Sequence, residues 1–112
     1  MPTLNFKHGV NPTRVEPEIL LAIMVAQSVY AEHGFDCVIT SLRDTAPGRK
    51  PNSLHNRDQI CRAVDFRINH LPNELVATIC TSIALRLPDG YDVVQETDHL
   101  HVEWDPKPGE AA

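Results

Sequence analysis

The feature that most constrains the fold is the alternation of apolar and polar side chains in Ala63-Val64-Asp65-Phe66-Arg67-Ile68. Successive side chains of a β-strand point to opposite faces, so this pattern predicts a strand with one buried face. A sheet that is apolar on one face has to bury that face against a second layer. The rest of the sequence must therefore supply that layer.

The N-terminal third of the chain predicts an amphipathic helix. Apolar side chains between Ile19 and Tyr30 recur mostly at i, i+3 and i+4 spacing, which places them on one helical face. Pro17 suits the first helical turn, where its missing N–H is not needed. Gly34 is well placed to end the helix.

A second helix is predicted over residues 73–87, whose apolar side chains also share one face. Asn73 is expected to be its N-cap, and Glu74 favours the first turn because a carboxylate interacts well with the helix N-terminus. Pro88-Asp89-Gly90 ends this helix and turns the chain.

Further strands are predicted over residues 37–40, 91–94 and 99–104, the last two as a hairpin around 96–98. Residues 42–60 are polar and contain prolines, which indicates a long loop of the kind that is often functional. The predicted order is helix, strand, long loop, strand, helix, strand, strand. This order indicates an α+β fold, with a small mainly antiparallel sheet and the helices packed on one face.

Length and composition predict one domain over residues 1–112, with an irregular segment at 1–15 and a flexible tail at 106–112. The balance of 10 Lys+Arg against 15 Asp+Glu argues against a nucleic-acid partner. The longest apolar stretch, 19–26, is too short for membrane insertion. We also expect no secretory signal, and three cysteines without a CxxC pair favour a reducing compartment.

The residues most informative about function are the histidines and carboxylates near the end of the chain. Asp65, His101 and the distant His55 offer three nitrogen or oxygen donors, the ligand number of a hydrolytic zinc site that keeps one position open. His99 and His101 point to the same face of a strand, so both can reach one site. An ordinary surface pair of histidines is the alternative that spacing alone leaves open.

Three short motifs sharpen this interpretation: Ser53-Leu54-His55, Arg62-Ala63-Val64-Asp65 and His99-Leu100-His101. Together they resemble the lysostaphin/D-Ala-D-Ala-carboxypeptidase/hedgehog group of zinc proteins, above all its small phage-type and hedgehog-like members. The resemblance covers about residues 36–106. It implies a hedgehog/D-Ala-D-Ala carboxypeptidase-like fold and a Zn²⁺ ion bound by His55, Asp65 and His101.

The resemblance also implies catalytic roles. A carboxylate shortly before the last ligand acts as base, which points to Asp98 or Glu96, and the D-x-x-H form of some phage lysins favours Asp98. His99 would donate to the developing oxyanion. Arg43 is either a substrate-carboxylate ligand or an ordinary surface residue. Glu103 is either the carboxylate that orients a ligand histidine or a solvated side chain.

The sequence departs from the family pattern between the first two ligands. His55 and Asp65 are separated by a longer segment, and Cys61 replaces the glycine that precedes R-A-V-D in the family. An insertion of about three residues near 56–60 explains this, because loop-closure entropy grows slowly with length. The alternative is a degenerate site in which His55 no longer reaches the metal.

The donor set predicts a zinc-dependent peptidase. The resemblance implies that it hydrolyses peptidoglycan stem peptides or cross-bridges, as a phage endolysin or a bacterial cell-wall peptidase. Its expected location is the cytoplasm until lysis, or the virion. The alternative is a catalytically inactive, hedgehog-like zinc-binding structural or virion protein. The altered segment between His55 and Asp65 is the feature that favours this alternative.

Overall fold

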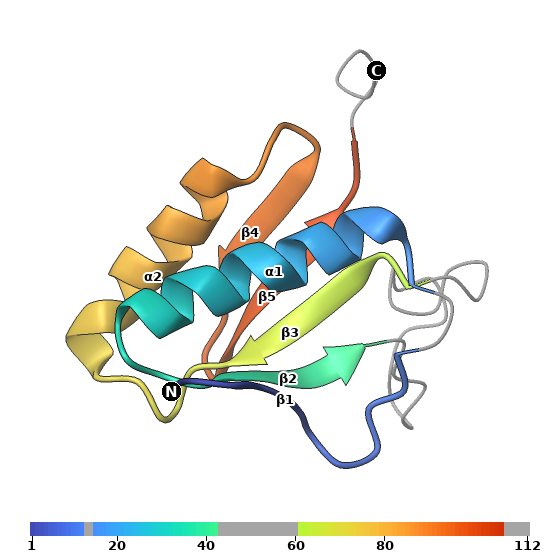
Figure 1. Cartoon of the computed structure of the whole chain (residues 1–112). Helices are drawn as coiled ribbons and strands as arrows, with labels where there is room; N and C mark the ends of the chain where they lie inside the picture. Colours follow the sequence, from blue (N-terminus) through green and yellow to red (C-terminus); the bar gives the residue numbers. More distant parts are fainter. Residues whose placement is uncertain (13–14, 43–60, 107–112) are drawn as a thin grey trace.

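The computed structural model describes residues 1–12, 15–42 and 61–106. Within these residues the fold is α+β, as predicted, with two helices and a five-stranded sheet (Figure 1). In chain order the elements are β1 (Leu4–Phe6), α1 (Pro17–Glu32), β2 (Cys37–Leu42), β3 (Ala63–Arg67), α2 (Asn73–Arg86), β4 (Tyr91–Gln95) and β5 (His99–Trp104). The tail that follows residue 106 was predicted to be flexible and lies outside the described residues.

The sheet has the strand order β1-β2-β3-β5-β4, and only the β1–β2 pair is parallel. The prediction of a mainly antiparallel sheet is therefore confirmed. The prediction that residues 1–15 are irregular is wrong for Leu4–Phe6, which form β1 and pair with β2 in the register Leu4↔Cys37. All three β1 side chains are exposed, and an alternation of only three residues, Leu4-Asn5-Phe6, is too short to predict a strand.

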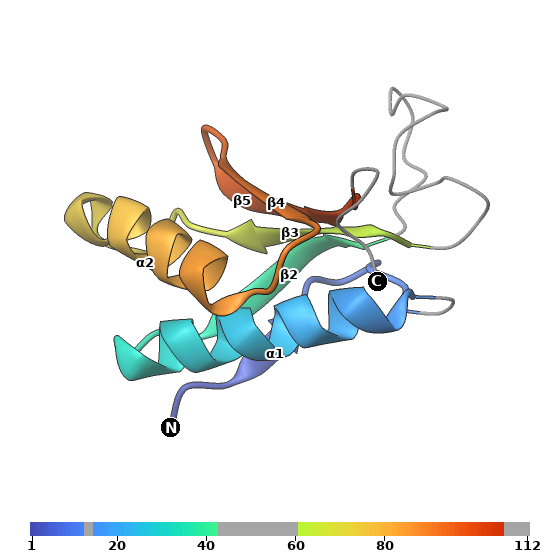
Figure 2. The same cartoon turned by 90° about the horizontal axis from the view of Figure 1, so that it is seen from above.

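Both helices cover the same face of the sheet (Figures 1 and 2). Their buried side chains meet those of the central strands in one core. Neither helix is long and apolar enough to cross a membrane. The largest fully buried side chains include Tyr30, Ile39, Val64, Phe66, Ile79, Ile83, Leu100 and Val102.

The helix boundaries agree with the sequence signals except at the start of α2. α1 begins at Pro17 and ends just before Gly34, which has a φ of 86°. Asn73 was predicted to cap α2, but it is the first helical residue and Pro72 occupies the cap position. Pro72 has no side-chain oxygen or backbone N–H to offer, and its ring fixes the φ at which the chain enters the helix.

β3 is more buried than its alternation suggested. Val64 and Phe66 face the helices, opposite Val102 and Leu100 of β5. Asp65 on the other face is also buried, with 8% of its surface exposed. β3 lies between β2 and β5, and side chains of these neighbouring strands shield its polar face.

β4 and β5 form the predicted hairpin, and the Glu96 N–H donates to the His99 carbonyl at 2.8 Å in its turn. Gly90, just before β4, has a φ of 103°. A Cβ at this position would overlap the ring of Trp104. Glycine is therefore required here both by backbone conformation and by space.

Candidate metal centre

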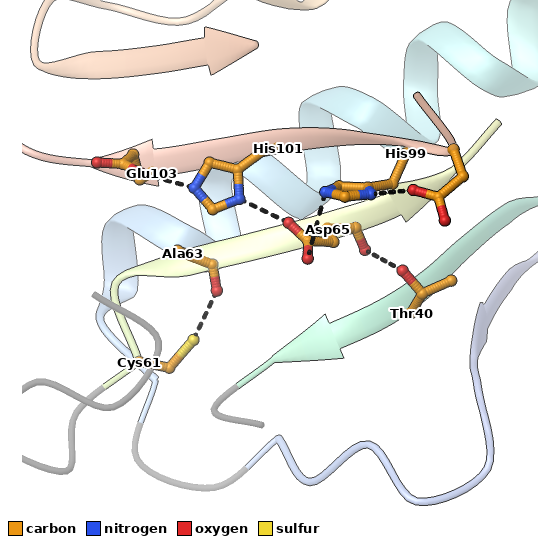
Figure 3. Close-up of polar contacts among 8 residues, drawn as sticks. Thr40, Cys61, Ala63, Asp65, His99, His101 and Glu103 are labelled. Atoms are coloured by element: carbon orange, nitrogen blue, oxygen red, sulfur yellow. Dashed lines mark hydrogen bonds and ion pairs between the residues drawn. The ribbon is translucent and has the colours of Figure 1, made fainter. Parts of the chain in front are cut away.

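Asp65, His99 and His101 come together on the face of the sheet opposite the helices (Figure 3). Alternation along β5 buries Leu100 and Val102 against the core and turns the two histidines to the other face. Register places Asp65 of β3 directly opposite His101. Strand pairing therefore assembles the group from residues far apart in the sequence.

The geometry of this group suits a metal ion. One ligand atom from each residue lies within 4.8 Å of the others. The Nδ1 of His101 is 2.6 Å from Oδ1 of Asp65, and the Nε2 of His99 is 3.7 Å from Oδ2 of the same carboxylate. Ligand atoms around one zinc lie roughly 3–3.5 Å apart, given bonds of about 2.0–2.2 Å. Small side-chain movements would bring all three donors to one ion, so the group could hold a metal.

Each histidine contacts a second carboxylate through its other ring nitrogen. Figure 3 shows the contact between His101 and Glu103. The His101 Nε2–H donates to Oε1 of Glu103 at 2.6 Å, and the His99 Nδ1–H donates to Oδ1 of Asp98 at 2.6 Å. Such contacts fix the tautomer and orientation of a ligand imidazole. Of the two roles predicted for Glu103, the contact with His101 supports the orienting one.

The charges of the centre follow from these contacts. The hydrogen bond to Asp65 raises the pKa of His101 to about 9, burial opposes this shift, and Glu103 adds to it. Without metal, His101 is therefore a cation between two carboxylates at neutral pH. The hydrogen bond from His99 lowers the pKa of Asp98, so that carboxylate is ionised at neutral pH.

The predicted site residues are brought together only in part. Asp65 and His101 meet as expected. His99, predicted only to donate a hydrogen bond to the oxyanion, lies close enough to them to be a metal ligand as well. His55, predicted as a metal ligand, and Arg43, predicted to bind substrate, lie outside the described residues.

The two candidate bases differ in position. The Asp98 carboxylate contacts His99 and is 79% exposed. Glu96 contacts His99 through its backbone N–H, and its exposed side chain does not belong to the metal-binding group. Cys61, at the position of the family glycine, is buried, and its thiol donates to the Ala63 carbonyl at 2.8 Å.

A groove with a volume of about 310 Å³ opens beside the metal-binding group. Its lining is polar and comes from four strands and their ends. Sequence reasoning missed the basic residues in it, because nothing in their local sequence connects them to the histidines. The lining residues are Lys7, Thr40, Ser41, Arg67, Asn69, Asp98 and His99.

A second group of potential ligands, Asp92, Glu103 and Asp105, lies nearby within the described residues. It contains carboxylates alone, without the nitrogen donors typical of zinc sites.

Comparison of the chain with protein families, curated proteins and solved structures found no significant match. The geometry and the sequence motifs are thus the basis for assigning a function.

Proposed function

We propose that this protein is a zinc-dependent peptidase that hydrolyses peptide bonds in peptidoglycan stem peptides or cross-bridges. The observation that carries the proposal is the Asp65–His99–His101 group, with Asp98 at its border and a groove beside it. Two imidazoles and one carboxylate are a common donor set for catalytic zinc. The substrate class rests on the sequence resemblance described above.

Asp65 and His101 are the two ligands on which the resemblance and the geometry agree. The third donor, which is the second nitrogen, is His55 in the resemblance and His99 in the described geometry. A bound Zn²⁺ would supply Lewis acidity, which polarises the scissile carbonyl and acidifies water. Glu103 would hold the His101 ring in place through the Nε2–H contact.

Asp98 is the best candidate for the general base. Its carboxylate is ionised at neutral pH and lines the groove, whereas Glu96 is not among the lining residues. His99 donates to one oxygen of Asp98 and so fixes the orientation of the carboxylate. Asp98 would accept a proton from the attacking water and pass it to the leaving amine.

Metal content and peptide release test the proposal together. The zinc-loaded full chain should bind about one Zn²⁺ at the Asp65–His101 centre. Asp65→Asn and His101→Ala should lose this zinc, whereas Asp105→Asn, in the all-carboxylate group, should keep it. Of His55→Ala and His99→Ala, the variant that loses zinc identifies the third donor.

Soluble peptide released from purified peptidoglycan provides the catalytic readout. Asp98→Asn should retain zinc and lose about 10²–10⁴-fold in rate, the usual contribution of a general base. Glu96→Gln should retain both zinc and activity. If zinc-loaded wild type releases no peptide, the enzyme assignment is wrong and the non-catalytic alternative is favoured.

A further inference from the structure

The groove beside the metal-binding group contains two basic side chains, Lys7 and Arg67. Arg67 is the register partner of His99 on the neighbouring strand. Lys7 follows β1, and its backbone N–H donates to the Ile39 carbonyl at 2.8 Å, which continues the β1–β2 pairing. The parallel edge strand thus brings a lysine from the start of the chain to the same groove as the histidines.

The charge of this groove differs from that of the whole protein. The chain has a net charge of -5, yet the described lining of the groove combines two cations with one carboxylate, Asp98. Asp98 already accepts a hydrogen bond from His99. In the part of the chain that the structure describes, neither the Lys7 ammonium nor the Arg67 guanidinium has an ion-pair partner. Both charges are therefore available to an anionic ligand.

We propose that Lys7 and Arg67 bind a carboxylate of the peptide ligand in this groove. The inference rests on the proposed function and adds to it a determinant of substrate choice. A guanidinium binds a carboxylate through two parallel hydrogen bonds, and an ammonium adds a mobile point charge. Thr40 and Asn69 supply further polar groups in the same lining.

A carboxylate bound here would orient the peptide relative to the metal centre. Asp98 and His99 belong both to the groove lining and to the contacts of the metal-binding group. A second hollow of about 220 Å³ shares Lys7 and Thr40 with the groove and offers room for the adjoining part of a peptide. The protein should then prefer peptides with a free carboxylate, either at the C-terminus or on an acidic side chain.

Binding of small peptides to the zinc-free full chain tests this inference without any turnover. The probes are N-acetyl-Ala-Ala with a free C-terminus, its C-terminal amide, and N-acetyl-Ala-Glu amide, followed by calorimetry and backbone amide NMR. At least one of the two acids should bind about tenfold more tightly than N-acetyl-Ala-Ala amide, because its carboxylate accepts charge-assisted hydrogen bonds that the amide cannot accept. The tighter acid identifies the carboxylate that is recognised.

Arg67→Met and Lys7→Met should each weaken binding of that acid by about tenfold and leave amide binding unchanged. Arg86→Met removes the same charge from α2 and should bind as wild type. Equal binding of acids and amide, no binding of either acid, or unchanged binding by both variants would overturn the inference. Equally tight binding of inorganic phosphate would replace the carboxylate assignment with a general anion site.

The two proposals fail separately. Absence of peptide release from peptidoglycan contradicts the peptidase proposal and leaves the acid–amide comparison unaffected. Conversely, the zinc-loaded protein could cleave peptidoglycan while the zinc-free protein binds acids and amide equally. The protein would then be a peptidase without a carboxylate subsite at Lys7 and Arg67.

Discussion

His101 shows how one residue depends on its neighbours in this centre. It lies between the carboxylates of Asp65 and Glu103, with one ring nitrogen directed to each. The Asp65 side is where a metal would bind, and the Glu103 contact holds the ring in the orientation that presents Nδ1 to it. Asp65 and His101 were predictable from the sequence motifs. The partnership with Glu103 became definite only with the strand conformation.

Replacement of Glu103 should weaken zinc binding without removing a ligand. Glu103→Ala should raise the zinc Kd by about 10–100-fold, and Glu103→Gln by less, because the amide oxygen still accepts from Nε2–H. Competition with a chelating dye measures the Kd, and the exposed Glu74→Gln on α2 is the control. An unchanged Kd in Glu103→Ala would contradict the orienting role.

At the scale of elements, the β4–β5 hairpin determines where the histidines point. Gly90 begins this hairpin with a positive φ and lies against the ring of Trp104. Gly34, after α1, also has a positive φ, but a Cβ there would meet no atom within 4 Å. Alanine substitutions at the two glycines therefore separate the free-energy cost of a side chain at positive φ from the cost of steric overlap with Trp104.

Gly90→Ala should lower the free energy of unfolding by more than Gly34→Ala does. Gly34→Ala carries only the conformational cost of about 1–2 kcal/mol for a side chain at positive φ. Gly90→Ala adds displacement of the Trp104 ring, an overpacking cost of about 1–3 kcal/mol. Urea unfolding measures the free energy of unfolding of both variants. Equal decreases would show that the Trp104 ring moves aside at no measurable cost.

The two helices are joined by an exposed ion pair between Glu32 and Arg86. The guanidinium of Arg86 donates to both Glu32 oxygens, at 2.7 and 2.6 Å. This pairing lowers the pKa of Glu32 in the folded protein. The folded state therefore favours the ionised carboxylate, and the resulting stabilisation is present above the unfolded pKa of about 4.3 and disappears as pH falls through the lower folded value.

Glu32→Gln should accordingly destabilise the protein at neutral pH and have no effect in acid. The difference from wild type should shrink with added salt, because both side chains are exposed. Arg86→Gln should show the same pH dependence, and the double variant should lose no more than either single one. Thermal unfolding across pH measures this, and a difference that persists in acid would assign the effect to packing.

For the whole molecule, a metal at the centre would link β3 and β5 within the folded sheet. The unfolded chain has no preformed site, so metal binding should add to the stability of the fold. Free zinc at about 100 times the Kd contributes about 2.7 kcal/mol, which corresponds to a rise in Tm of roughly 10 °C for a domain of this size.

Scanning calorimetry with zinc and then with excess chelator measures this shift. The rise should reverse on chelation and be absent in Asp65→Asn, while Asp105→Asn should behave as wild type. A shift of the same size in Asp65→Asn would place the stabilising metal elsewhere, in the all-carboxylate group for instance.

The sequence by itself determined α1, α2, β2, β3 and the β4–β5 hairpin, because apolar periodicity and turn residues are properties of neighbouring positions. It also identified Asp65 and His101 as a pair. Only the tertiary structure decided that β1 joins the sheet and that Lys7 and Arg67 share a groove with His99. These facts depend on strand order and register, and pairing energies between distant segments leave no periodic signal in the local sequence.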